Sequence, residues 1–444
     1  MANNKNFKIK NSLDVTKLPD FAATTTSTPD GPDGLFSTTL YTGTGSSNTV
    51  TTGIDLSGSN EGLVWIKKRG TGSTYNHNLF DTIRGVTKWL ISDDTDAEGT
   101  RATGLSAFNS DGFTEGGSGW TGESGKNFVA WTWKSAASFF DVVTYTGTGS
   151  ARTISHNLGS VPGMIMIKKR SNAGNWMVYH RGANGGTNPE QYYAKLNDTD
   201  AWATLASAWN NTAPTSSVFS LGDQINVNQN GETYVAYLFG HDTSSSSNIQ
   251  CGYYTGNGSA SGPSINLGWS PQWLMVRNSE RASPWRIIDT ARDFSSTATR
   301  DGLWANSNAN EDTTSPLIIA RTSTGFDIKD NNSGFNHSGE KIIYVAIRLT
   351  EPKFTLDLST GNRFSFTPTA ATELVFSNPP ATGIPTGFSL EVVNPSAYAL
   401  TWPSSIKWHG GSAPTVNAGK AVYAFITTDG GTNYFGKLAG EGIA

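Results

Sequence analysis

The acidic run Asp-Asp-Thr-Asp-Ala-Glu is the part of the sequence best suited to binding a cation. Its Asp94, Asp96 and Glu98 stand at alternate positions, and carboxylate oxygens are the ligands that Ca²⁺ prefers. Asp and Asn also form turns by accepting hydrogen bonds from nearby backbone, and this is the interpretation that we favour. Residues 198–200 repeat the pattern as Asp-Thr-Asp, whereas residues 306–308 read Asn-Ser-Asn. A Ca²⁺ site is therefore expected only at the first two of these places, if at all.

Two Asp-x-x-Arg segments are the second group of polar residues with matching positions. They are Asp81 with Arg84 and Asp289 with Arg292, while residues 179–181 read Tyr-His-Arg at the corresponding place. An Asp–Arg pair that locks a loop is the interpretation that we favour, and a polar contact with a ligand is the alternative.

Other catalytic or metal-binding patterns are missing from the sequence. The six His residues are scattered and lack the spacing of metal ligands. No Gly-x-Ser-x-Gly elbow and no phosphate loop occurs. The single Cys251 excludes an intrachain disulfide and is expected to act as a small apolar residue. We therefore predict a protein that is not an enzyme, with no catalytic residues and no cofactor. A carboxylate pair for glycoside cleavage forms only in space, so a glycan depolymerase stays open as a less favoured alternative.

Tryptophans are the remaining side chains with binding chemistry, because they can stack on sugar rings. Most of those considered lie on strand-like runs, so core packing is the favoured interpretation for each. They are Trp65, Trp131, Trp133, Trp176, Trp209, Trp273 and Trp285.

A threefold repeat positions all of these residues. Each copy opens with Tyr-Thr-Gly-x-Gly, continues with an apolar run that ends in basic residues, and closes with an apolar segment that contains Val-Ala. The openings lie at residues 41–45, 145–149 and 254–258, and the apolar-basic runs at 63–69, 164–170 and 273–277. Three anchors in constant order and at near-constant spacing indicate one module of about 100 residues used in tandem. Such repetition favours a surface-building or binding protein over an enzyme.

The composition indicates short strands joined by polar turns. Charged residues are only 15% of the 444 residues, while 49 are Gly and 49 are aromatic (14 Trp, 14 Tyr, 21 Phe). We predict an all-β fold of tandem antiparallel β-sandwich modules, lectin- or jelly-roll-like, plus a C-terminal β-domain. Residues 201–209 form the one helix-like stretch.

Five segments are expected along the chain. Residues 36–135, 136–243 and 244–350 form β-sandwich repeats 1, 2 and 3, and residues 351–444 form the C-terminal β-domain. Residues 1–35 hold one alternating strand and a Thr/Ser/Pro/Gly linker. They are expected either to dock on another protein by strand addition or to be a frayed terminus.

Charge and hydropathy limit the partners and the location. The net charge is −4 and no extended basic stretch occurs, so no nucleic-acid partner is expected. No apolar run approaches 18 residues and no secretion signal opens the chain. We predict a soluble protein, folded in a cytoplasm and not inserted in a membrane.

The repeat motifs together resemble a module of tailed-phage virion proteins, especially tail-fibre and appendage proteins of marine phages. This resemblance covers residues 36–350, and the last domain resembles a segment near the ends of phage tail fibres. Its carriers there are residues 356–361, 376–380, 401–404 and 427–431.

The resemblance implies a phage virion structural protein, in the form of a tail fibre or appendage that attaches to a host surface glycan. Many weak sites in parallel suit such attachment. The alternative is a head fibre or capsid decoration protein with a purely structural role. The implied partners are other virion proteins, reached through the N-terminal arm, and further copies of the chain in a homotrimer. The family brings no catalytic residues to carry over.

Overall fold

The computed structural model describes residues 34–443 apart from 71–73, 245, 296–301, 313–318, 350–352, 369–371, 397–399, 404 and 417–418. These residues form two compact units that divide near residue 350. We call them the repeat unit and the C-terminal domain. Strands account for 45% of the chain and helices for 6%, so the prediction of an all-β fold is confirmed. Residues 1–33 of the predicted docking arm lie outside the described residues.

Repeat 1 contains a six-stranded sheet and a three-stranded sheet, both antiparallel. Its strands are β1 (Phe36–Thr42), β2 (Asn48–Thr51), β3 (Gly62–Lys68), β4 (Asn78–Asp81), β5 (Lys88–Ile91), β6 (Gly99–Thr100), β7 (Leu105–Asn109), β8 (Gly112–Glu115) and β9 (Asn127–Lys134). The large sheet has the order β1-β9-β3-β4-β5-β6 and the small sheet β2-β8-β7. The first and last strands are therefore neighbours, which closes the repeat on itself.

Repeat 2 follows the same plan. Its strands are β10 (Phe140–Thr146), β11 (Arg152–Ser155), β12 (Met164–Lys169), β13 (Met177–His180), β14 (Tyr192–Lys195), β15 (Ala203–Thr204), β16 (Val218–Leu221) and β17 (Thr233–Phe239). The sheets have the orders β10-β17-β12-β13-β14-β15 and β11-β16. Its short helices are η2 (Ala183–Gly186), η3 (Pro189–Gln191), α1 (Ala206–Trp209) and α2 (Ile225–Asn228). The helix-like stretch expected at residues 201–209 is thus helical only in its last four residues.

Repeat 3 has the orders that correspond to those of the other two repeats. Its strands are β18 (Ile249–Thr255), β19 (Ser264–Asn266), β20 (Pro271–Asn278), β21 (Arg286–Asp289), β22 (Leu303–Trp304), β23 (Ile319–Arg321), β24 (Gly325–Ile328) and β25 (Lys341–Arg348). The sheets are β18-β25-β20-β21-β22 and β19-β24-β23. Two short helices, η4 (Thr290–Arg292) and α3 (Ser333–Asn336), complete the repeat. None of the helices in the described part of the chain is long and apolar enough to span a membrane.

The glycines of the Tyr-Thr-Gly-x-Gly motif are required by close backbone contacts. At the first glycine of each copy (Gly43, Gly147 and Gly256) an added methyl group would overlap with a carbonyl oxygen. The second glycine has a φ of 69–75° in all three copies, which favours glycine. The tyrosine hydroxyl of each copy donates to a backbone carbonyl about 80 residues away, at 2.5–2.7 Å. The motif therefore links the first strand of each repeat by a hydrogen bond to the segment that precedes its last strand.

The central strand of each repeat is buried on both sides, between two cores. In β3, Leu63 and Trp65 belong to a core that all three repeats share, whereas Val64 and Ile66 belong to a core within repeat 1. Successive side chains point to opposite faces of a strand, so a strand between two cores has to be apolar throughout. This explains the unbroken apolar runs at β3, β12 and β20.

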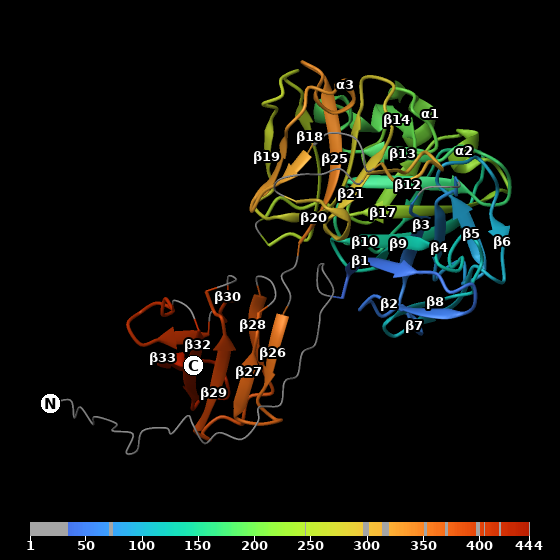
Figure 1. Cartoon of the computed structure of the whole chain (residues 1–444). Helices are drawn as coiled ribbons and strands as arrows, with labels where there is room; N and C mark the ends of the chain where they lie inside the picture. The colour runs from blue at the N-terminus through green and yellow to red at the C-terminus, as the bar shows by residue number, and fades with distance from the viewer. Residues whose placement is uncertain are drawn as a thin grey trace. The chain divides into compact units, whose positions relative to one another are not determined.

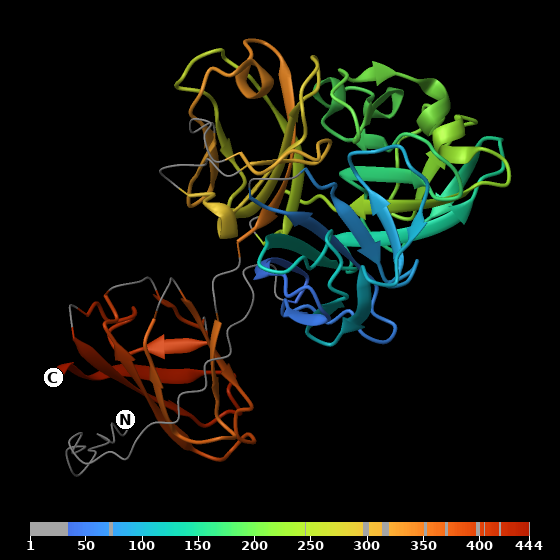
Figure 2. The same ribbon diagram turned by 45° about the vertical axis from the view of Figure 1, so that its right-hand side comes forward.

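The shared core joins the three repeats into one body. It includes Phe36 and Trp133 of repeat 1, Phe239 of repeat 2 and Trp273 of repeat 3. The Trp133 ring lies 5.6 Å from the Trp273 ring and 6.1 Å from the Phe239 ring, centroid to centroid. Figures 1 and 2 show the three repeats, coloured from blue through green to orange, packed against one another. The tandem repeats therefore form one packed unit and are not three separate domains.

The C-terminal domain has a different topology, in which the chain moves back and forth between two sheets. Its strands are β26 (Lys353–Asp357), β27 (Arg363–Phe366), β28 (Thr372–Ser377), β29 (Thr386–Val393), β30 (Leu400–Thr401), β31 (Ile406–Trp408), β32 (Lys420–Thr427) and β33 (Tyr434–Ile443). The sheets have the orders β26-β28-β30 and β27-β29-β32-β33-β31. Parallel pairing occurs between β26 and β28, β28 and β30, β27 and β29, and β31 and β33.

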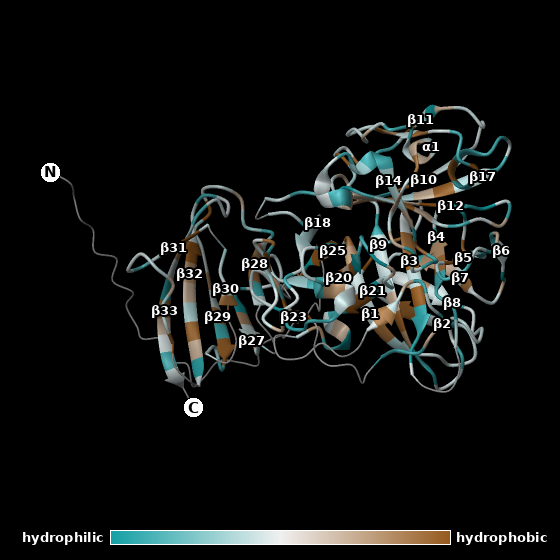
Figure 3. Ribbon diagram, turned by 90° about the horizontal axis from the view of Figure 1, so that it is seen from above, coloured by the Kyte–Doolittle hydropathy of each residue, from teal (hydrophilic) through white to brown (hydrophobic). Residues whose placement is uncertain are grey.

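Apolar residues alternate with polar ones along the larger sheet of the C-terminal domain. The buried set includes Phe388 and Leu390 of β29, Phe425 of β32 and Tyr434 of β33. Figure 3 shows the alternation on β32 as brown and paler segments. One face of this sheet thus covers the core, and the other face is free to meet solvent or a ligand.

Candidate functional site

The three repeats contact one another in a closed cycle of hydrogen bonds. The contacts are Tyr237 Oη to Asp81 Oδ2 (2.6 Å), His180 Nε2 to the Tyr344 carbonyl oxygen (3.0 Å), and Trp131 Nε1 to Asp289 Oδ2 (2.9 Å). In each contact the last residue of β4, β13 or β21 meets the closing strand of another repeat. Repeat 1 therefore contacts repeat 2, repeat 2 contacts repeat 3, and repeat 3 contacts repeat 1. The unit has an approximate threefold arrangement within one chain.

A buried ion-pair network joins repeat 1 to repeat 2. Asp81 and Arg84 pair with both side chains completely buried. Arg84 also contacts Glu98 at 3.1 Å, and Glu98 accepts from Arg170 of repeat 2 at 2.9 Å. Burial opposes ionisation of Glu98, but the two arginines outweigh it and lower the pKa of Glu98. The Asp–Arg segment therefore locks a loop and also anchors an interface between repeats.

The same network recurs where repeat 3 meets repeat 1. Asp289 and Arg292 pair at 2.6 Å with both side chains completely buried. Glu311 accepts from Arg292 at 2.9 Å and from Arg69 of repeat 1 at 2.7 Å. Burial works against the charged form of Arg292, but Asp289 and Glu311 reverse the effect and raise its pKa.

Among the described residues, the interface between repeats 2 and 3 lacks these ion pairs, and the buried Arg277 of repeat 3 donates instead to the backbone carbonyls of Lys195 and Asp200 of repeat 2. His180 stands where the other interfaces have Asp, and the backbone N–H of Trp202 donates to the carbonyl of Ser279 at 3.0 Å. In the first interface the N–H of Glu98 makes the matching bond, at 2.8 Å, to the carbonyl of Arg170. Trp202 and Ser279 thus replace the Glu and Arg of the charged interfaces. Burial lowers the pKa of His180 to about 3, so the imidazole is neutral there.

The acidic run proposed as a Ca²⁺ loop lies at the first interface. Glu98 is held by its two arginines, while Asp94 Oδ1 accepts from the N–H of Thr95 at 2.5 Å, which is a local turn contact. Lys168 of repeat 2 donates to the Thr95 carbonyl at 2.9 Å. Burial lowers the pKa of Lys168 to about 8, and the negative charge of Asp96 opposes this shift. Within the described residues, no group of three or more His, Cys, Asp or Glu side chains is arranged to hold a metal ion. The run thus has a structural role at the interface, and Ca²⁺ binding stays a prediction.

The tryptophans singled out in the sequence are packed inside the repeat unit. All seven are at most 2% exposed, so none of them offers a face to a sugar. Cys251 is also fully buried, and burial raises the pKa of its thiol.

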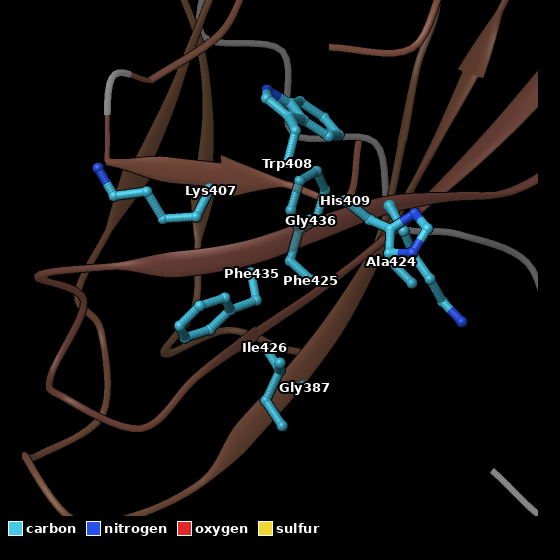
Figure 4. Close-up of a pocket in the computed structure, with 10 residues that line it drawn as sticks. Gly387, Lys407, Trp408, His409, Ala424, Phe425, Ile426, Phe435 and Gly436 are labelled. Atoms are coloured by element: carbon cyan, nitrogen blue, oxygen red, sulfur yellow. The ribbon is translucent and has the colours of Figure 1, made fainter. Parts of the chain in front are cut away.

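An open groove lies on the C-terminal domain. Its volume is about 970 Å³, and its lining is Gly387, Lys407, Trp408, His409, Ala424, Phe425, Ile426, Phe435, Gly436 and Lys437. Figure 4 shows the lining, with Phe435 and Ile426 close together and Gly387 beside Ile426. A groove of this size is in the range of small-molecule and sugar sites.

Strand register builds the groove from four strands. Gly387 of β29, Ile426 of β32, Phe435 of β33 and Lys407 of β31 are successive cross-strand partners. They lie on the face opposite the core, because Tyr434, next to Phe435, is buried. Phe435 is 56% exposed and Ile426 is 38% exposed, and the two are neighbours on one face of the sheet. The groove therefore presents an aromatic ring and an aliphatic side chain to solvent.

The sequence interpretation did not identify this groove. The period-two alternation along β33 was the available signal, because it places Phe435 opposite Tyr434. Lys407 and Gly387 are far from Phe435 in the sequence, and only the strand order brings them together.

One comparison with known proteins bears on the repeat unit. Residues 31–351 match the model of a family described as domain of unknown function (DUF7483). The match covers more than half of the chain, so the chain belongs to this family. No curated protein matches it.

Proposed function

We propose that this chain is a structural protein of a tailed-phage virion, acting as a tail fibre or appendage that attaches the particle to a host surface glycan. The observation that carries the attachment role is the open groove of the C-terminal domain, with Phe435 exposed on its surface. Sugar-binding sites combine an aromatic face with a few polar groups at the rim. The virion assignment rests on the resemblance of the repeat motifs and of the C-terminal motifs.

The repeat unit supports a scaffolding role beside the binding role. Its three sandwiches share one core and are joined by buried charges. A body of this kind resists bending, and it can hold a binding domain away from a particle. Two of its buried polar side chains, Arg84 and His180, make hydrogen bonds between repeats, to the Tyr237 hydroxyl and the Tyr344 carbonyl respectively. In the proposal the protein binds without turnover.

A head fibre or capsid decoration protein is the second candidate function. The approximate threefold arrangement of the repeats favours it, because one chain could sit on a threefold position of a capsid lattice. The proposed homotrimer belongs to the first candidate, and so does docking through residues 1–35. A depolymerase is not proposed, because the described residues that line the groove include no carboxylate and glycoside hydrolysis ordinarily uses two.

Localisation on intact particles tests the proposal. An antibody raised against the purified chain should label the tail or its appendages in electron micrographs. The purified chain, added in excess, should also lower the adsorption of particles to host cells. Labelling over the head without an effect on adsorption would favour the second candidate. Absence of label from particles would refute both.

A further inference from the structure

We propose that the groove of the C-terminal domain binds an acidic sugar residue, one that carries a carboxylate or a sulfate. The sugar ring would stack on Phe435, and its acidic group would lie between Lys407 and Lys437. This inference rests on the proposed attachment function and names the class of glycan that it would take.

The stacking surface is a row of side chains across the sheet. Phe435 is paired with Ile426, which is paired with Gly387. Gly387 carries no side chain, and Ala424 lies one step along the same face, next to Lys437. These small residues leave the floor open beside the exposed ring. A sugar ring can therefore rest its apolar C–H face on Phe435 without displacing a side chain.

Cations border this surface. Lys407 is the cross-strand partner of Phe435, and Lys437 lies two residues after Phe435 on the same side of β33. Arg363 joins the same face as the partner of Ser389 on β29. Among the described residues, neither Lys407 nor Lys437 forms an ion pair with a carboxylate. Two unpaired lysines beside an exposed ring favour an anionic ligand.

The carboxylate nearest to this surface by register is already engaged. Glu391 lies two residues beyond Ser389 on β29 and accepts a hydrogen bond from Ser365 at 3.2 Å. It also lies 3.8 Å from Lys420. The positive character of the groove is local, because the whole chain has a net charge of −4.

A second copy of the chain is a less suitable occupant. Packing this face around a symmetry axis would bring the same lysines of each copy together, and like charges across an interface repel. The exposed apolar side chains here are only Phe435 and Ile426 within the groove lining. A stable protein interface ordinarily buries about 800 Å² on each partner, which two side chains do not supply.

Binding to defined polymers by the full chain tests the inference. The probes are polygalacturonate, dextran sulfate, neutral dextran and a single-stranded oligonucleotide, each immobilised for biolayer interferometry. We expect binding to one or both acidic polysaccharides and none to neutral dextran. Binding should weaken at least tenfold between about 50 mM and about 500 mM NaCl, because exposed charges are screened by salt.

Three groove variants separate the contributions. Phe435→Ala removes the stacking ring, and Lys407→Glu combined with Lys437→Glu reverses the charge. Gly387→Leu places a side chain on the open floor of the groove. A methyl group at this position would lie 3.6 Å from the Phe425 carbonyl oxygen, an ordinary contact, so the fold should tolerate the substitution. Each variant should lower the affinity for the acidic polymer at least tenfold. Circular dichroism spectra should match that of the wild type.

Matched controls lie outside the groove. Ile384→Ala removes an equally exposed hydrophobic residue (55%) of the same domain, and Lys126→Glu reverses an exposed charge in the repeat unit. Both should bind like the wild type.

Several results would overturn the inference. Equal binding to neutral dextran, lost in Phe435→Ala but not in the charge reversal, would refute the acidic class and leave glycan attachment standing. Binding of the oligonucleotide alone would refute a glycan ligand for the groove. Self-association that Phe435→Ala abolishes would assign the face to a second copy. No binding to any polymer would refute the inference, while the particle-labelling and adsorption experiments would still decide the proposed function.

Discussion

Removal of Asp289 should destabilise the repeat unit more than any change to an exposed ion pair. The variant is Asp289→Ala, at the interface between repeats 3 and 1. Asp289 accepts from the side chain and the backbone N–H of Arg292, and from the indole N–H of Trp131. None of these groups has access to water, since Asp289 and Arg292 are completely buried and Trp131 is 0% exposed.

The loss in free energy of unfolding depends on the groups that Asp289 leaves without a partner. Breaking a buried ion pair by removing one partner costs about 3–5 kcal/mol, because the other charge is left uncompensated. Arg292 keeps Glu311 at 2.9 Å and the Ile287 carbonyl at 3.2 Å, which lowers the cost. Trp131 loses its only hydrogen-bond acceptor, which adds about 1–3 kcal/mol. We expect a total of about 4 kcal/mol.

Urea denaturation followed by tryptophan fluorescence measures this loss. Twelve of the fourteen tryptophans precede residue 350, so the signal reports mainly on the repeat unit. The control is Asp327→Ala, which removes an ion pair with Lys329 whose side chains are 22% and 43% exposed. Such pairs are worth less than about 1 kcal/mol, so its midpoint should barely move.

A compensating variant tests the reasoning directly. Asp289→Leu with Arg292→Met removes both charges, and replacing a buried pair by apolar residues is often neutral or stabilising. This double variant should recover most of the stability that Asp289→Ala loses. Light scattering on the same sample should record its molar mass. A loss below about 1 kcal/mol in Asp289→Ala, or a double variant less stable than the single one, would refute the argument.

Three further predictions concern the backbone, pH and the thiol. Gly147→Ala should cost more than about 2 kcal/mol in urea denaturation, because the added methyl group would meet the Gln229 carbonyl; Gly361→Ala, which meets nothing within 4 Å, is the control and should be near neutral. Burial lowers the pKa of His180 to about 3 from 6.5, so the folded state resists protonation and its stability should fall as pH drops from about 6.5 towards 3, by up to ~4 kcal/mol. His180→Gln should flatten this part of the pH profile, and an unchanged slope would contradict the assignment. Cys251, buried and with a raised thiol pKa, should react with a thiol reagent only in denaturant; fast labelling of the native chain would contradict its burial.

Local features of the fold could be predicted from the sequence because short-range chemistry determines them. The Tyr-Thr-Gly-x-Gly motif indicated a strand turn, and the turn forms because the first glycine lies against a carbonyl and the second has a positive φ. An unbroken apolar run is typical of a strand buried on both faces, and β3 is buried throughout. The Asp–Arg segments indicated locked loops, and each pair does close a loop of four residues.

Contacts between repeats could not be predicted in the same way. Asp81 meets Tyr237 across 156 residues, and Asp289 meets Trp131 across 158. Nothing in the spacing of one repeat indicates which surface of the next will face it. The groove could not be predicted from the sequence for the same reason, since residues 387, 407, 426 and 435 become neighbours only through the strand order β29-β32-β33-β31.

The difference between the interfaces gives the buried charges a role that stability alone does not explain. Three similar sandwiches in one chain could pair in the wrong order or with the repeats of another chain, because their strand orders correspond. At the charged interfaces a wrong partner would deprive Glu98 of Arg170 or Glu311 of Arg69, and a buried charge that loses its partner is strongly unfavourable. At the interface between repeats 2 and 3, His180 and Arg277 need only backbone carbonyls. We infer that the two charged interfaces specify the order of the repeats, as repulsive or unsatisfied contacts specify other assemblies. The double variant at positions 289 and 292 addresses this inference, since it removes the Asp289–Trp131 contact across the closing interface and the arginine that shares Glu311 with Arg69. Exchange of repeats between chains should then give larger species in light scattering. A strictly unchanged molar mass would leave the ion pairs with a purely local role.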